Sequence, residues 1–75
     1  MNKPASLQKP WYLYLIECSA GSIYAGISTD VEARYAKHCR GQGARYTRAK
    51  PPVRLIGAML CGSKSAALKQ EWAIR

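Results

Sequence analysis

Residues 11–18, WYLYLIEC, are almost wholly apolar or aromatic, and this run is short enough to be a strand that is covered on both faces. Turn-forming residues follow at 19–22, and residues 23–27 resume the apolar pattern as the second strand of a hairpin. Another short apolar run at residues 53–60 predicts a third strand. The chain should therefore fold around a small three-stranded sheet whose first pair is antiparallel.

A helix is predicted directly after the hairpin. Thr29 is followed three residues later by Glu32, which is the pattern of a capping box at a helix N-terminus. We expect this helix to run over about residues 30–40 and to end at Gly41.

The second half of the chain predicts a loop, the third strand and one more helix. Residues 41–52, GQGARYTRAKPP, are rich in Gly, Arg and Pro and are expected to form the loop. Ser63 or Ser65 can cap the last helix, which shows no stop signal and is expected to continue past the end of this chain. The order β-β-α-β-α indicates an α+β fold with helices flanking the sheet.

Size and cysteine usage limit the class of protein. Seventy-five residues suffice for one small domain, which we place at residues 11–75 after a short flexible leader at 1–10. The sequence has no run of about 18 apolar residues that would span a membrane and no apolar segment typical of a secretory signal. Its three cysteines are odd in number and far apart, which favours a reducing, cytoplasmic location.

Positive charge dominates the middle of the sequence. Twelve Lys and Arg oppose four Asp and Glu, and no acidic residue occurs from position 33 to 70. A zone of one sign attracts a polyanion, and nucleic acid is the commonest polyanion inside a cell. We expect the nucleic-acid-binding residues to be Lys37, Arg40, Arg45, Tyr46, Arg48 and Lys50. Tyr46 can stack on an exposed base, which would favour single-stranded or distorted DNA.

Two tyrosines on the hairpin can come together. Side chains alternate along a strand, so the positions of Tyr14 and Tyr24 relative to each other depend on the hairpin register. We expect them to share a face, with Gly26 leaving an open notch beside Tyr24. On the following helix, Arg34 and His38 are four residues apart and therefore stack along the edge of its apolar stripe.

The order of these residues resembles that of the GIY-YIG nuclease domain. The resemblance lies in Tyr12-Leu13-Tyr14, in Tyr24-Ala25-Gly26, and in the helix with Arg34 and His38, and it covers residues 11–75. The stretch GISTDVEARYAKH is especially similar to the small bacterial single-domain members of that family.

The resemblance implies a metal-dependent nuclease that hydrolyses phosphodiester bonds in DNA, with roles in DNA repair, recombination or uptake. It assigns Tyr14, Tyr24, Arg34 and His38 to catalysis, and Glu71 to a single Mg²⁺ or Mn²⁺ ion. Branched DNA is a further substrate that relatives of this kind suggest. We expect Tyr24 to take the proton of the attacking water, with His38 accepting or relaying it, and Tyr14 to bind the scissile phosphate or the water.

The sequence also departs from the family pattern. Tyr12 stands at the first glycine of the motif, Ala25 at its second isoleucine, and Ile27 where some relatives have a lysine whose task His38 can take over. Nothing corresponds to the asparagine that follows the glutamate in larger members. The alternative function is a basic regulatory module that binds DNA or RNA without cutting it.

Overall fold

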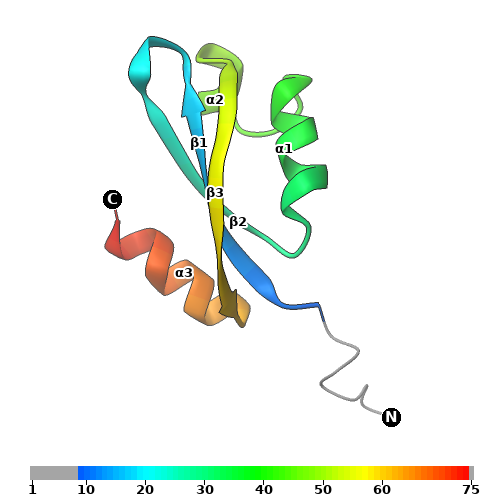
Figure 1. Cartoon of the computed structure of the whole chain (residues 1–75), viewed down its shortest axis with the longest axis vertical. Coiled ribbons are helices and arrows are strands. Elements are labelled where there is room, and N and C mark those ends of the chain that lie inside the picture. The colour runs from blue at the N-terminus through cyan, green and yellow to red at the C-terminus, as the bar shows by residue number, and fades with distance from the viewer. Residues whose placement is uncertain (1–8, 75) are drawn as a thin grey trace.

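The computed structural model describes residues 9–74, which form a three-stranded antiparallel sheet flanked by helices (Figure 1). In chain order, the elements are β1 (Trp11–Cys18), the 3₁₀ turn η2 (Ser19–Gly21), β2 (Ile23–Ser28), α1 (Val31–Cys39), α2 (Arg45–Ala49), β3 (Pro52–Gly62) and α3 (Lys64–Ala73). The strand order is β2-β1-β3, and both neighbours run antiparallel to the central β1. The predicted α+β fold is thereby confirmed. The expected leader at 1–10 lies almost entirely outside the described residues.

The hairpin register decides which side chains meet on the sheet. Ala20 and Gly21 take positive φ angles of 63° and 73°, which close the turn between β1 and β2. Tyr14 pairs with Gly26, and Ile16 pairs with Tyr24. Directly opposed residues point to the same face, so Tyr14 and Tyr24 share a face as the sequence predicted.

Both faces of the sheet are covered by other parts of the chain. Tyr14, Ile16 and Cys18 alternate along β1 and form the buried core on one face, against which α1 packs with Val31 and Tyr35. On the other face, Leu13 and Leu15 line a cavity together with Ile74, which directly follows α3. Figure 1 accordingly shows α1 and α3 on opposite sides of the sheet.

The first helix begins one residue later than a Thr29 cap would place it. Asp30 is the N-cap, and its Oδ1 accepts a hydrogen bond from the backbone N–H of Ala33 at 3.1 Å. The prediction of Thr29 as the cap was wrong, because the Asp30 backbone N–H bonds the Ser28 hydroxyl at 2.9 Å and leaves the carboxylate, a strong N-cap acceptor, facing the helix. The helix ends at Cys39 and is followed by Gly41 at φ 74°, as the terminal glycine indicated.

The expected loop at 41–52 contains a short helix, α2, that the sequence did not predict. It has no side-chain N-cap, and five residues are too few for a helix that is stable by local interactions alone. Its tertiary anchor is Thr47, whose side chain is only 1% exposed.

The N-cap of the last helix is Ser63, one of the two serines that the sequence predicted as caps. Its hydroxyl accepts a hydrogen bond from the backbone N–H of Ala66 at 3.0 Å. No helix among residues 9–74 is long and apolar enough to cross a membrane.

Candidate active site

Tyr14 occupies the centre of the predicted site. It lies on the middle strand, is 1% exposed, and extends its ring across the backbone of Gly26 on β2. A Cβ atom at Gly26 would collide with the Tyr14 hydroxyl and with the ring carbon that carries it. The notch that we expected at Gly26 is therefore filled by Tyr14 itself, and the glycine serves a close approach within the protein.

Three rings gather around this position. The ring centroids of Tyr14 and Tyr24 are 6.4 Å apart, and the imidazole of His38 lies 5.9 Å from the first and 5.1 Å from the second. All three pairs are tilted, a geometry that aromatic pairs prefer over face-to-face stacking. The hairpin and α1 thus bring together the two tyrosines and the histidine that the sequence predicted.

His38 is buried and both of its ring nitrogens have partners. Its Nε2 lies 2.9 Å from the Tyr14 hydroxyl, and its Nδ1 lies 2.7 Å from the Thr47 hydroxyl. Burial lowers the pKa of His38 below its ordinary value, and the nearby positive charge of Arg34 lowers it further. The imidazole is consequently neutral at physiological pH. The tyrosine at Nε2 of His38 is Tyr14, whereas the sequence suggested a relay through Tyr24.

Arg34 and Glu71 lie within electrostatic range of the same phenol. Burial raises the pKa of Tyr14, and hydrogen bonding and charge from Arg34 act in the opposite direction. The charges of Tyr24 and Glu71 raise the pKa of Tyr14 as well. Side chains from β2, α1 and α3 therefore influence the phenol that β1 carries.

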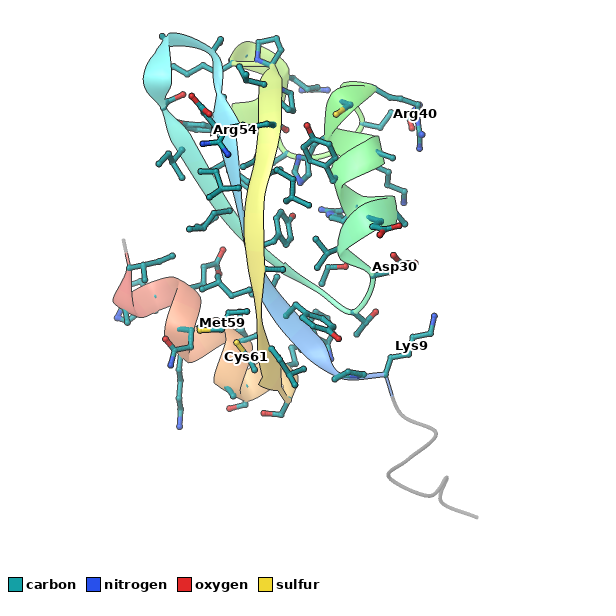
Figure 2. The ribbon with its side chains drawn as sticks, in the orientation of Figure 1. Lys9, Asp30, Arg40, Arg54, Met59 and Cys61 are labelled. Carbon is teal, nitrogen blue, oxygen red and sulfur yellow. The ribbon has the colours of Figure 1, made fainter. Side chains whose placement is uncertain are left out.

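A guanidinium at the edge of the apolar stripe of α1 needs an anionic partner, and Glu17 is an acidic side chain that could supply one. The carboxylate of Glu17 pairs with Arg54 on β3, with 2.6 Å between Oε1 and Nε (Figure 2). The partly buried Arg34 therefore remains a candidate for an anionic ligand.

The donor set suits a single hard cation. Residues 9–74 contain no cluster of three or more His, Cys, Asp or Glu side chains that could enclose a metal ion. Within this range, Glu71 on α3 is the carboxylate whose charge raises the pKa of Tyr14. Mg²⁺ typically binds proteins through one or two carboxylates and keeps several waters, so a site with one glutamate is compatible with that ion.

The predicted nucleic-acid-binding residues lie on α1 and around α2. Lys37 is exposed on the second half of α1, and Arg40 is exposed directly after this helix (Figure 2). Arg45, Arg48 and Lys50 are exposed on α2 and at its end. Tyr46 is 38% exposed, and its ring centroid lies 5.7 Å from that of Tyr24. The Lys50 Nζ lies 5.6 Å from the Tyr46 ring centroid. The short helix therefore carries a cationic, aromatic surface up to the edge of the tyrosine pair.

Sequence reasoning missed residues that contact His38, among them Thr47 and Gly43. Thr47 bonds the imidazole, and Gly43 lies so close to it that a Cβ atom there would collide with the ring. Thr47 follows His38 by nine residues, a spacing with no meaning in a single helix or strand. Only the fold of the segment between α1 and α2 brings them together.

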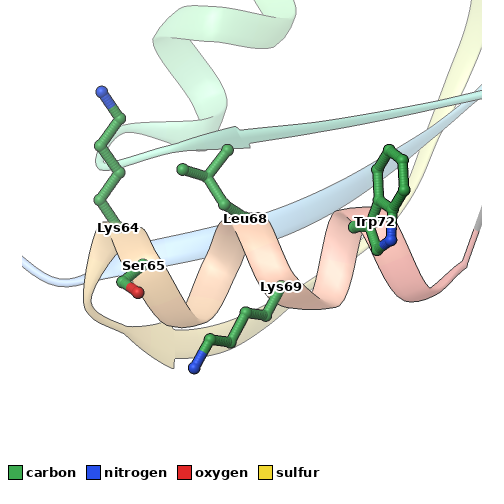
Figure 3. A pocket seen from close by; sticks show the side chains of 5 residues that line it. All are labelled: Lys64, Ser65, Leu68, Lys69 and Trp72. Atoms are coloured by element: carbon green, nitrogen blue, oxygen red, sulfur yellow. The ribbon is translucent and has the colours of Figure 1, made fainter.

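A separate cavity runs along α3 and involves none of the predicted residues. Lys64, Ser65, Leu68, Lys69 and Trp72 line it (Figure 3). Leu68 and Trp72 project from the same side of the helix, and Trp72 is 76% exposed.

Comparisons with known proteins agree with this architecture. Residues 10–75 match the family model described as the GIY-YIG catalytic domain. The chain is 53% identical over 70 residues to a UPF0213 protein of Cupriavidus pinatubonensis, which covers 93% of this chain and 78% of that protein. It is 42% identical over 76 residues to a UPF0213 protein of Vibrio cholerae, with 100% and 75% covered. The solution NMR structure of a UPF0213 protein from Bacillus halodurans is similar at a TM-score of 0.51 and 42% identity, over 85% of this chain and 68% of that one.

Proposed function

Since this chain belongs to the GIY-YIG family, a nuclease superfamily, we propose that it is a metal-dependent nuclease that hydrolyses phosphodiester bonds in DNA. The observation that carries the proposal is the meeting of Tyr14, Tyr24 and His38 in one ring cluster, with Arg34 and Glu71 acting on its central phenol. A module that only binds nucleic acid would not require these three rings to meet where the charges of Arg34 and Glu71 also influence the central phenol.

Arg34 is the group that we assign to the phosphate. Hydrolysis of a phosphodiester places additional negative charge on the phosphoryl oxygens in the transition state. A guanidinium can donate two parallel hydrogen bonds to such a group, which a lysine cannot do. The Arg34 side chain acts on Tyr14, and because it is partly buried, it faces less competition from water.

Tyr24 is the group that we assign to the attacking water. It is more exposed than Tyr14, whose hydroxyl is occupied by His38, and therefore more accessible to a substrate. A phenol within hydrogen-bond reach of the attacking water can take its proton as a general base. In this assignment, Tyr14 orients the phosphate or the water.

Glu71 is the side chain that we assign to the divalent cation, Mg²⁺ or Mn²⁺. When bound there, the ion would polarise the phosphoryl group and stabilise the leaving oxygen. The negative charge of Glu71 influences Tyr14, and such a carboxylate attracts a cation and repels a second anion.

The surface around α2 is the part that we assign to binding the DNA strand. Arg45, Arg48 and Lys50 supply charge for phosphates, and Tyr46 supplies a ring for a base. A base can reach that ring only where it is unpaired, so single-stranded or branched DNA is the expected substrate.

The test is a cleavage panel. The purified protein is incubated with single-stranded, duplex, flap and junction DNA, and with RNA of the same sequences, in Mg²⁺, Mn²⁺ or EDTA. We expect the wild type to yield products only with a divalent cation, and we expect Arg34→Lys to be strongly impaired. Metal-independent binding without product across the whole panel would instead support the alternative, a regulatory binding module.

A further inference from the structure

The buried hydroxyl of Thr47 forms a contact that the proposed roles do not use. Thr47 is 1% exposed, and its Oγ1 lies 2.7 Å from Nδ1 of His38, which is itself 1% exposed. In a dry environment, such hydrogen bonds fix which groups donate and which accept.

The backbone of Ala44 determines the direction of these hydrogen bonds. Its N–H group points at Nδ1 of His38 with 3.4 Å between the two nitrogens. A backbone N–H can only donate, so this contact favours a lone pair on Nδ1. A neutral imidazole that has a lone pair on Nδ1 carries its hydrogen on Nε2.

The hydroxyl hydrogen of Thr47 is compatible with this assignment. Thr47 has two acceptors within reach, Nδ1 of His38 at 2.7 Å and the Ala44 carbonyl at 3.0 Å. That carbonyl already accepts from the Arg48 N–H at 3.2 Å, so it stays satisfied when the hydroxyl donates to the closer imidazole.

The consequence reaches Tyr14. With its hydrogen on Nε2, His38 donates to the Tyr14 oxygen across 2.9 Å. The hydrogen of the Tyr14 hydroxyl is then not used on His38 and is available for a third group. The close approach of Gly43, where a Cβ atom would meet the ring, fixes the imidazole from another side.

We propose that Thr47 is a positioning residue which, together with the Ala44 amide, holds His38 in the tautomer that carries its hydrogen on Nε2. His38 is therefore a hydrogen-bond donor to Tyr14 and does not accept a proton from either tyrosine. The catalytic consequence rests on the proposed function: Tyr14 keeps its hydroxyl hydrogen for the phosphate or the water.

The first test does not need activity. Two-dimensional NMR of protein labelled with ¹⁵N in histidine reports which ring nitrogen carries hydrogen, and His38 is the sole histidine of the sequence. We expect an unprotonated Nδ1 and a protonated Nε2 in the wild type and in Thr47→Ser, which retains the hydroxyl. Thr47→Val, which has nearly the same shape, should show a mixture of the two tautomers. A protonated Nδ1 in the wild type would overturn the proposal, even if Thr47→Val fails to fold.

The second test separates this proposal from the proposed function. Thr47→Val should lower kcat roughly tenfold with little change in KM, and Thr47→Ser should recover most of that loss. Equal kcat in Thr47→Val and the wild type would remove Thr47 from the positioning role. A wild type without nuclease activity but with the expected tautomer would refute the nuclease proposal and leave the hydrogen-bond assignment standing.

Discussion

Tyr14 and Tyr24 have identical side chains but lie in different environments. Tyr14 is enclosed, bonded to His38, and has a pKa raised by burial. Tyr24 lies nearer to the solvent and beside Tyr46. The two phenols therefore have different tasks in the proposed reaction, and each task can be tested by removal of one hydroxyl.

We expect Tyr24→Phe to reduce DNA cleavage by roughly a hundredfold or more, because loss of a general base typically costs that much. DNA binding, measured by fluorescence anisotropy without a divalent cation, should stay within about twofold of the wild type, because the ring and the basic surface remain. Cleavage at the wild-type rate would remove Tyr24 from the role of base.

Gly26 tests the close packing of Tyr14. Gly26→Ala should lower the free energy of unfolding by about 1–3 kcal/mol, because the new Cβ must displace the Tyr14 ring in a packed core. Gly57→Ala on β3 is the matched control, since a Cβ there meets nothing within 4 Å. Urea unfolding of both variants measures the difference, and equal effects would show that Tyr14 does not lie tightly over Gly26.

His38 should make the stability of the protein depend on pH. Its pKa in the folded protein is lowered by burial and by Arg34, so the unfolded chain binds the proton more readily. The contribution of His38 to the free energy of unfolding is fully present above its pKa in the unfolded chain, about 6.5. It decreases as the pH falls from there through the lower pKa of the folded state, by at most about 1.4 kcal/mol per pH unit.

Urea unfolding between pH 7.5 and 5 measures this effect, with His38→Gln as the control that lacks the titrating group. A stability that falls equally in the wild type and in His38→Gln over this range would assign the pH dependence to other residues.

At the scale of elements, α2 is the part that the sequence did not predict. The strands and the two longer helices are indicated by apolar runs, caps and a terminal glycine. Residues 45–49 show none of these signals, because their helix depends on the contact of Thr47 with His38 and not on local propensity. Tertiary contacts thus supply both the element and the residue that sequence reasoning missed.

The candidate site was more predictable than α2. The alternation of strands places Tyr14 and Tyr24 on one face once the register is known, and the helical period places His38 one turn after Arg34. The register itself depends on the turn at Ala20 and Gly21, which the composition of residues 19–22 left open. The bond between His38 and Tyr14 was unpredictable because it depends on how the ring lies over Gly26.

The basic side of α2 should contribute to DNA affinity through phosphate charge. The double variant Arg45→Gln/Arg48→Gln is expected to weaken binding and to reduce the slope of log K against log salt by up to about 2, because up to two phosphates would no longer be neutralised. Lys64→Gln/Lys69→Gln on α3 removes the same charge from another surface and should change the slope less. Anisotropy titrations at several salt concentrations measure both slopes, and equal changes would show that α2 has no special role in binding.

At the scale of the whole molecule, the candidate site draws on helices from both sides of one small sheet. The helix that carries Arg34 and His38 covers one face, and the helix that carries Glu71 lies on the other side (Figure 1). Both nevertheless act on Tyr14, whose ring extends over β2, an edge strand of the sheet. The whole account depends on this convergence, because Glu71 and Arg34 have no common role if they act at different places.

The most direct test of that convergence is cleavage of DNA by Glu71→Gln over a range of Mg²⁺ and Mn²⁺ concentrations, with Glu32→Gln on the exposed first turn of α1 as the matched control. Both variants should bind DNA in EDTA at least as well as the wild type. We predict that Glu71→Gln loses metal-dependent cleavage while Glu32→Gln retains it. Cleavage by Glu71→Gln at the wild-type rate and with the wild-type metal dependence would contradict the account.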